Sequence, residues 1–390
     1  MGSRRLFMKK VAATGITFCS CCILDAKAQY APGKNDPALK DAGNDKSLSH
    51  RHPLAGTKHK PVIINGRRIP VIDTHAHCFF PEAIALLPAN ANLNAAVKGG
   101  PNHYIPVSDD AALKSRIENM DAKGVDMEVL SINNFWYTMD RETATKVCEI
   151  NNRNLAQVCA AYPKRFSAFA CIATQFPDLA IQQLEEAMKN PCFKGATIQA
   201  NVAGVEHADP RFHPIWAKVE ELGATLFIHP QGTPPLAARL KGNGWMTNTI
   251  GNPLDTTIAL QHLIYEGVFD KFPNLKVIAA HGGGFLGSYA PRMDHSCFIS
   301  PANCNPDIVL KKKPTEYLNQ IFFDALVFTP EALRHLVAQV GASQVVVGTD
   351  SPIPWEEYPI EHVMSTPLTN AQKAAILGDN ASKLLKIRNL

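Results

Sequence analysis

The chain has 390 residues, of which 46% are hydrophobic and 19% are charged, a composition typical of a globular protein with a large core. Its formal net charge of +4 comes from the N-terminus, because residues 1–28 carry five Lys or Arg and one acidic residue. The rest of the chain has 34 basic and 34 acidic residues and is therefore neutral. A near-neutral body gives no electrostatic reason to expect a nucleic acid as a partner, so this class of function is excluded.

The N-terminus has the features of an export signal. Arg4-Arg5 form a twin-arginine pattern, an apolar run follows over residues 11–24, and Ala26-Lys27-Ala28 is an A-x-A cleavage site. We predict a twin-arginine signal peptide over residues 1–28 and a periplasmic location; the alternatives are another export signal or a retained anchor. The apolar run is shorter than the ~20 residues of a membrane span, so we expect no stable span after cleavage.

Residues 29–60 are rich in Pro, Gly, Asn, Asp and Lys, which predicts a flexible leader ahead of one catalytic domain over residues 61–390. Seven of the ten cysteines follow the signal peptide, and none of these seven forms a C-x-x-C pair. We interpret most of them as small buried residues. Cys297 and Cys304 are candidates for a disulfide in an oxidising compartment.

From residue 61 on, short apolar runs alternate with helical patterns, after an Asn65-Gly66 pair that predicts a hairpin turn. The predicted strands are 71–73, 128–132, 166–172, 196–199, 225–228, 276–280, 321–325 and 345–347. The predicted helices are 109–124, 141–162, 179–189, 211–222, 254–272, 330–340 and 370–384. Strands that alternate with helices form a parallel sheet, and this number of units predicts a single α/β (β/α)8 TIM barrel. The alternative, an open doubly wound sheet, lacks its usual nucleotide-binding loops here.

Side chains that bind metals follow three of the predicted strands. His75 and His77 end the first strand, where residues two apart share one face of the chain. His229 ends the fifth strand and Asp350 follows the eighth. Barrel enzymes build their sites at this end of the strands, and burying such polar groups costs free energy unless something binds them. We predict that these four residues hold one divalent metal ion.

Neutral imidazoles with one carboxylate suit Zn²⁺, and the ligand types also admit Mn²⁺ and Fe²⁺. An open coordination position would hold a water whose pKa the ion lowers. His281 ends the sixth predicted strand and is the expected acid/base, because imidazole titrates near neutral pH. Gly282–Gly284 either let the backbone approach a ligand closely or form a tight turn.

Several motifs resemble the amidohydrolase superfamily, in the branch of 2-amino-3-carboxymuconate-6-semialdehyde decarboxylase. The resemblance extends from about Val71 to the C-terminus and is carried by residues 116–125, 251–259, 267–273, 280–284 and 348–354. It implies that the four candidate ligands bind the metal and that His281 activates its water. It also implies that Arg292 binds a substrate carboxylate, in some members across a dimer interface, and that Trp245 lies on a loop over the site. We therefore expect a homodimer.

The chain departs from that branch in the loop after the first strand. The decarboxylase has a second carboxylate-binding arginine there, whereas residues 79–108 contain none and offer only Lys98 and His103. We therefore do not expect the two-carboxylate substrate of that decarboxylase, and the missing arginine slightly favours a hydrolase. From the site as a whole we predict a metal-dependent carboxy-lyase that decarboxylates a small aromatic or unsaturated carboxylate, with His281 or Asp350 transferring the proton. The alternatives are a hydrolase of an amide, ester or lactone or a hydratase on the same site, and a non-catalytic periplasmic binding protein.

Overall fold

The computed structural model describes residues 56–86, 110–388 and 390. The predicted signal peptide and almost all of the predicted leader lie outside the described residues and stay predictions, as do the positions of Lys98 and His103. No helix within the described residues is both long enough and apolar enough to cross a membrane.

Eight parallel strands form one sheet, and their order in the sheet follows the chain. They are β3 (Ile72–His77), β4 (Met127–Ser131), β5 (Phe166–Cys171), β6 (Phe193–Gln199), β9 (Thr225–His229), β10 (Lys276–Ala279), β11 (Ile321–Asp324) and β12 (Val345–Val346). Bridges from Asp73 to Val347 and from Ala76 to Ser351 join the last strand to the first, which closes the barrel. The predicted (β/α)8 fold is confirmed.

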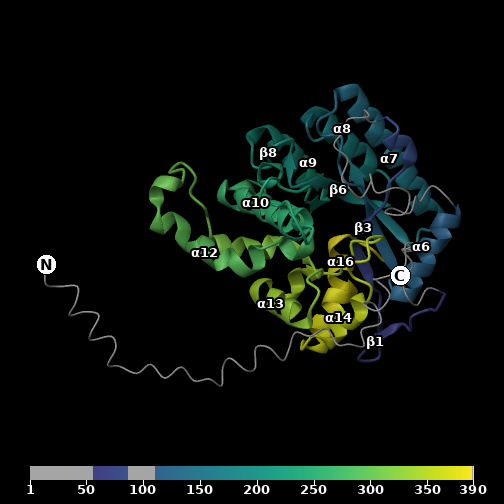
Figure 1. The fold of residues 1–390 in the computed structure, drawn as a ribbon. Coiled ribbons are helices and arrows are strands. Elements are labelled where there is room, and N and C mark those ends of the chain that lie inside the picture. The colour runs from purple at the N-terminus through teal and green to yellow at the C-terminus, as the bar shows by residue number, and fades with distance from the viewer. Residues whose placement is uncertain (1–55, 87–109, 389) are drawn as a thin grey trace, which may run out of the picture. The chain divides into compact units, whose positions relative to one another are not determined.

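Helices follow the strands and lie outside them (Figure 1). They are α4 (Pro81–Ile84), α6 (Asp110–Lys123), α7 (Arg141–Ala161), α8 (Pro177–Met188), α9 (His213–Leu222), α10 (Asn252–Tyr265), α11 (Val268–Lys271), α12 (Leu286–Ile299), α13 (Pro330–Val340), α14 (Pro359–Ser365), α15 (Asn370–Ala374) and α16 (Asn380–Leu384). Side chains on both faces of the strands are buried almost throughout, because helices cover one face and the barrel interior the other.

Local sequence explains several of the element ends. Asn65 and Gly66 adopt positive φ angles of 50° and 77° in the predicted turn, which joins the antiparallel strands β1 (Val62–Ile64) and β2 (Arg67–Ile69). The Asp140 side chain accepts a hydrogen bond from the backbone of Thr143 and caps α7. Gly223 ends α9 in the left-handed conformation, with φ of 60°.

The structure differs from the sequence-based expectation in several helical segments, and the short helices α4 and α14 were not predicted. The predicted helix 254–272 is interrupted at Gly267, which has φ of 70° and separates α10 from α11. Residues 375–379 inside the predicted last helix form a π-helical turn. Helix α12 was not predicted, because it contains Pro291 and much of its surface is exposed, which weakens the amphipathic pattern. A short ribbon of β7 (Asn201–Val202) and β8 (Val205–Glu206) was also missed.

Cys297 and Cys304, the candidate pair, form a disulfide at the end of α12. The remaining cysteines in the described residues are free, and all but one of them are buried. Cys192, the exception, lies half-buried between α8 and β6. The interpretation of most cysteines as small buried residues is therefore confirmed.

Candidate metal centre

The five predicted site residues gather at the carboxyl ends of the barrel strands. His75 and His77 come from β3, His229 ends β9, and His281 and Asp350 follow β10 and β12. The Nε2 atoms of His75 and His77 are 3.1 Å apart, and Asp350 Oδ1 lies 3.3 Å and 3.0 Å from them respectively. The His229 ring centre lies 4.6 Å from that of His77 and 5.4 Å from that of His281. The structure therefore brings together side chains that are up to 275 positions apart in the sequence.

Ligand atoms of His75, His229, His281 and Asp350 all lie within 4.8 Å of one another, as expected for residues that can hold a single metal ion. This group includes His281 but not His77, whereas the sequence predicted His77 as the fourth ligand. His77 nevertheless has the shorter contacts, since its Nε2 is 3.0 Å from Asp350 Oδ1, whereas His281 Nε2 is 3.7 Å from Asp350 Oδ2. All five side chains thus line one divalent-metal site.

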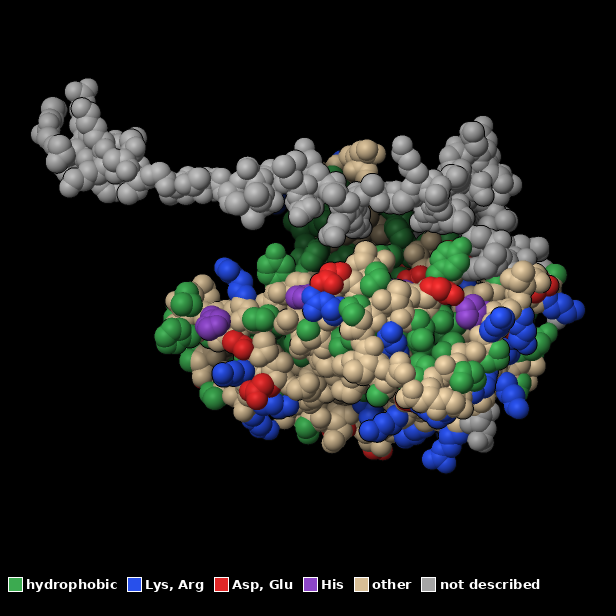
Figure 2. Space-filling view, turned by 90° about the horizontal axis from the view of Figure 1, so that it is seen from below, with side chains coloured by type: hydrophobic (Ala, Val, Ile, Leu, Met, Phe, Trp, Pro, Cys, Tyr) green, Lys and Arg blue, Asp and Glu red, His purple; other side chains and the backbone are tan. Residues whose placement is uncertain are grey.

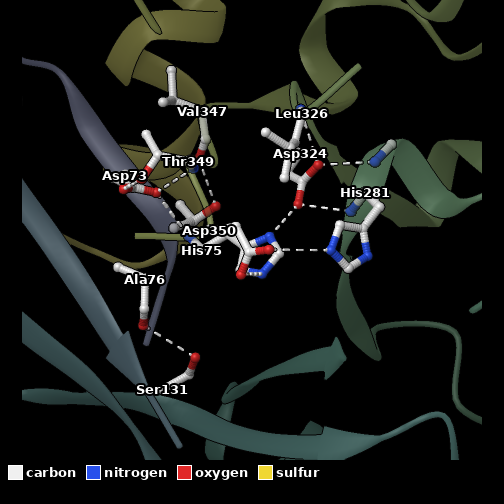
Figure 3. A network of polar contacts seen from close by, with 12 residues as sticks. Asp73, His75, Ala76, Ser131, His281, Asp324, Leu326, Val347, Thr349 and Asp350 are labelled. Carbon is white, nitrogen blue, oxygen red and sulfur yellow. Dashed lines mark hydrogen bonds and ion pairs between the residues drawn. The ribbon is translucent and has the colours of Figure 1, made fainter. Parts of the chain in front are cut away.

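Hydrogen bonds fix the tautomers of His75 and His77. Asp324 Oδ2 lies 2.7 Å from His75 Nδ1, and a carboxylate accepts, so His75 carries its proton on Nδ1. The Ser131 hydroxyl donates to the Ala76 carbonyl at 3.2 Å and accepts from His77 Nδ1 at 3.0 Å. Both Nε2 atoms are then lone-pair acceptors that face each other and a carboxylate oxygen. Three lone pairs at this spacing repel one another unless a cation lies between them. Figure 3 shows the hydrogen bonds of Asp324 to His75 and of Ser131 to Ala76.

The spacing of these three atoms fits a metal ion. Ligands about 2.0–2.1 Å from a tetrahedral ion are about 3.3 Å apart. Adjacent ligands of an octahedral ion at a similar radius are about 2.9 Å apart. The observed separations of 3.0, 3.1 and 3.3 Å span this range. His229 Nδ1 and Asp350 Oδ1 are also buried without a hydrogen-bond partner, which is costly unless another group satisfies them.

The electrostatics of the site also favour a positive charge at its centre. Burial lowers the pKa of His75, but the carboxylates of Asp350 and Asp324 outweigh burial and raise it to about 10. Burial and the neighbouring imidazoles hold the pKa of His229 well below its usual value, so this ring is neutral. Burial would raise the pKa of Asp350, yet His75 and the other histidines hold it well below the usual range. His229 is thus neutral and Asp350 is ionised, whereas the raised pKa of His75 shows that its ring lies where the site favours a positive charge; a bound divalent ion would take the place of the proton on His75 Nε2.

Asp324 organises the site from behind and was not among the predicted site residues. Its carboxylate is fully buried at the end of β11. It accepts hydrogen bonds from the ring of His75 and from the backbone N–H groups of His281 at 2.9 Å and Gly282 at 2.8 Å. A Cβ at Gly348 would lie 2.7 Å from Asp324 Cβ, so only glycine allows this approach. Asp324 therefore orients one candidate ligand and the turn that carries the candidate acid/base.

The backbone of the site is held in uncommon conformations. His281 and Asp350 both have positive φ angles, of 56° and 59°. Such angles cost on the order of 1 kcal/mol or more in non-glycine residues and persist where the surroundings determine them. Asp350 N donates to the His75 carbonyl at 2.8 Å, which fixes Asp350 beside β3. The Asp73 carboxylate accepts from Thr349 and from His75 N, which ties the same two segments together (Figure 3).

Trp245 and Arg292 do not contact the metal site in this chain. Trp245 is 49% exposed and stacks on Trp355, with ring centres 5.8 Å apart. Phe328 packs edge-on against Trp355 at 6.0 Å, so these rings form an aromatic cluster on loops after β9, β11 and β12. Arg292 is exposed on α12 and lines a separate cavity of about 650 Å³ between α10, α12 and the disulfide segment.

The residues that sequence reasoning missed carried a usable signal in some cases. Asp324 and Ser131 each end an apolar strand, which is the pattern that identified the histidines. Trp355 and Phe328 gave no such signal, because an aromatic residue in a loop has no fixed spacing from a partner. Only the folded chain shows that they meet Trp245.

A closed parallel barrel with a histidine- and aspartate-lined metal site at its carboxyl end defines a class of metal-dependent barrel enzymes. The chain belongs to the amidohydrolase family, since that family's model matches residues 72–387.

Characterised relatives support this assignment. A 2-amino-3-carboxymuconate-6-semialdehyde decarboxylase of Dictyostelium discoideum is 32% identical over 274 residues, which cover 69% of this chain and 75% of that protein. A gamma-resorcylate decarboxylase of Rhizobium radiobacter is 27% identical over 285 residues, 70% of this chain and 86% of the relative. The fold matches a 5-carboxyvanillate decarboxylase of Novosphingobium aromaticivorans, solved with manganese and 4-hydroxy-3-methoxy-5-nitrobenzoic acid. That match has a TM-score of 0.71 at 22% identity and covers 85% of this chain and 100% of the other.

We predict that Asp324→Asn weakens metal binding by about 10- to 100-fold, because an amide cannot accept all the hydrogen bonds that orient His75 and the His281 turn. Competition with a chelator on the purified protein measures this affinity. Asp379→Asn is the matched control, since Asp379 pairs with Arg67 on the surface at 2.6 Å. An unchanged affinity in folded Asp324→Asn protein would contradict the positioning role.

Proposed function

We propose that the protein is a metal-dependent decarboxylase of a small aromatic carboxylate. The curated relatives named above are decarboxylases, and the one of Dictyostelium discoideum spans most of the barrel. The observation that carries the proposal is the convergence of His75 Nε2, His77 Nε2 and Asp350 Oδ1 on one point at the carboxyl end of the barrel. The lone pairs of these three atoms point to a shared centre, where they would bind a cation. A purely structural core would gain nothing from this arrangement, because the lone pairs repel one another.

We assign His75, His77, His229 and Asp350 as the ligands of the ion, and zinc as the ion. His77 takes precedence over His281 as a ligand because its Nε2 is closer to Asp350 and because Ser131 orients its ring. Three imidazoles and one carboxylate suit zinc. Manganese is the main competitor, since it occupies the related 5-carboxyvanillate decarboxylase. When bound, the divalent ion supplies Lewis acidity that withdraws electron density from a substrate oxygen.

His281 is the proposed proton donor. Its side chain is 15% exposed, whereas those of His75 and His77 are 0–1% exposed, so His281 can exchange protons with solvent. As carbon dioxide leaves, the electron pair of the broken carbon–carbon bond stays on the substrate carbon. A protonated His281 would deliver its proton to that carbon, and Asp350 Oδ2 lies 3.7 Å from His281 Nε2.

The aromatic cluster supports an aromatic substrate. Trp245, Trp355 and Phe328 lie on loops that leave the same strand ends as the metal site. Exposed rings at the entrance of a site offer faces on which a flat substrate can stack, a contact worth about 0.5–1.5 kcal/mol beyond burial. We propose that Trp245 takes part in this contact.

The central experiment measures metal content and product formation in matched variants of the purified protein. We expect His281→Ala to keep its metal and to lose carbon dioxide release by about 10²- to 10⁴-fold, because only the proton donor is removed. His77→Ala should lose metal in addition to activity. Metal analysis and a screen of aromatic monocarboxylates for carbon dioxide release provide the two readouts.

The reverse pattern, in which His281→Ala loses the metal and His77→Ala retains it, would exchange the two assigned roles. A hydrolase on the same site would release no carbon dioxide and would incorporate oxygen from labelled water into its product. That result would replace the decarboxylase proposal, and a protein that turned over neither class of substrate would refute both.

We also propose that the protein is a homodimer in which Arg292 binds the substrate carboxylate of the partner subunit. Within its own chain Arg292 lines a cavity away from the metal ligands. Hydrophobic side chains of the α12 region are exposed around it: Tyr289, Phe298, Ile299 and Val309. In Figure 2 hydrophobic side chains gather at the left end of the described surface, where Figure 1 places α12. Such a surface suits a contact between copies.

Mixing two inactive variants tests this arrangement. Arg292→Ala and His281→Ala subunits, each nearly inactive alone, should recover up to about a quarter of the wild-type activity after random reassociation, because one site of each mixed dimer is intact. Sedimentation analysis checks the dimer itself. Recovery of no activity from verified mixed dimers would place Arg292 outside the partner's site.

We further propose export through the twin-arginine signal over residues 1–28. The paired arginines and the A-x-A site support this, and export would place the Cys297–Cys304 disulfide in a suitable compartment. N-terminal sequencing of the protein from periplasmic fractions should begin at Gln29. Arg4→Lys together with Arg5→Lys should retain the uncleaved precursor in the cytoplasm; equal export of this variant would argue for another signal type.

A further inference from the structure

A cavity of about 340 Å³ lies at the end of the barrel opposite the metal site. Its walls include the first residues of two strands, Met127 of β4 and Phe166 of β5. They also include two free cysteines, Cys159 from α7 and Cys192 from the turn before β6. The metal site uses neither cysteine, and the described lining residues contain no Asp or Glu but several Lys and Arg.

The two thiols line the same cavity but differ in accessibility. Cys159 is 2% exposed and is therefore shielded, whereas Cys192 is only half-buried and borders the cavity. The backbone of Cys192 is fixed, because its N–H donates to Asn190 Oδ1 at 3.0 Å and its carbonyl accepts from Ala168 N at 3.0 Å. An accessible thiol beside a shielded one is the arrangement in which one sulfur reacts with an outside reagent and the other resolves the product.

The ammonium group of Lys194 lies on the turn that carries the accessible thiol, Cys192. Lys194 lines the same cavity, and its ammonium group donates to the Pro191 carbonyl at 2.8 Å, which holds it against the turn that carries Cys192. The hydrogen bond from the Cys159 thiol and the charge of Lys194 lower the pKa of Cys192, although partial burial opposes them. The other described free thiols are buried, and burial raises the pKa of Cys78 to about 12. Cys192 is therefore the reactive thiol of this set.

We propose that Cys159 and Cys192 form a redox-active dithiol site that low-molecular-weight disulfides oxidise. The Cys192 thiolate attacks one sulfur of the reagent disulfide, whose other half leaves as a thiolate and takes up a proton. The Cys159 thiol then loses its proton and attacks Cys192 Sγ, which expels the second half of the reagent. One external disulfide is reduced to two thiols, and the protein gains one disulfide.

The test treats the purified, metal-loaded protein with glutathione disulfide and maps peptides without reduction. We expect a peptide in which Cys159 is joined to Cys192, and a protein mass lower by two hydrogen atoms. Cys159→Ser should stop at a mixed disulfide on Cys192, and Cys192→Ser should not react at this site. Cys148→Ala is the control, because Cys148 is fully buried in α7 and should leave the reaction unchanged.

The pH dependence of alkylation separates this site from a structural pair. The midpoint for Cys192 should lie at a lower pH in the folded than in the unfolded protein, because Lys194 and Cys159 stabilise the thiolate. Lys194→Gln should raise that midpoint and slow alkylation at neutral pH by roughly threefold to tenfold. A wild-type protein that accumulates the mixed disulfide without resolving it, or a folded midpoint at or above the unfolded one, would overturn the proposal.

Discussion

The site depends on one electrostatic constraint: two imidazole Nε2 atoms and a carboxylate oxygen face one another inside the protein and need a positive charge between them. His75 Nδ1–H donates to Asp324 and His77 Nδ1–H donates to Ser131, so in the neutral rings both Nε2 atoms and the Asp350 carboxylate present lone pairs to the same point. In a buried setting such a convergence is costly without a positive charge. The hydrogen bonds behind the imidazoles therefore specify a cation site as firmly as the ligands themselves.

The same carboxylate links metal binding to proton transfer. Asp324 holds the ring of His75 and also the backbone of His281 and Gly282, so a shift of β11 would move a ligand and the proposed acid/base together. The left-handed backbone at His281 and Asp350 is supported by these and neighbouring hydrogen bonds. Strain of this kind is common where a side chain must be held at a point that regular structure does not reach.

Sequence reasoning predicted the barrel and the gathering of the five site residues because both follow from short-range rules. Apolar runs mark buried parallel strands, and a polar residue at the end of such a run must face the carboxyl end of the barrel. Asp324 and Ser131 obey the same rule but were missed, because a lone Asp or Ser is common after a strand. Helix α12 was missed because it contains Pro291 and because its exposed face weakens the helical spacing of apolar residues in its sequence.

Other features depend on contacts that no local pattern encodes. Trp245, Trp355 and Phe328 come from separate loops and meet only in the folded chain. Cys159 and Cys192 are likewise 33 positions apart with unrelated surroundings in the sequence. Arg292 shows the reverse case, because the family motif identified it but the folded single chain places it in a different cavity from the ligands.

The charge balance of the site limits the substrates that it can accept. In the proposed ligand set the divalent ion and the Asp350 carboxylate would leave one net positive charge, and the ionised Asp324 behind His75 would offset part of it, so the site would hold no more than a single substrate carboxylate. A second carboxylate would need a further cation beyond the ion and the proposed Arg292 of the partner subunit, yet residues 79–108 contain no arginine. Among the described residues Arg116 lies near β3, but its guanidinium is already paired with Glu128 at 2.6 Å and bonded to the His77 carbonyl. The balance therefore supports the proposed aromatic substrate with one carboxylate, and the aromatic cluster would offer a surface on which its ring could stack.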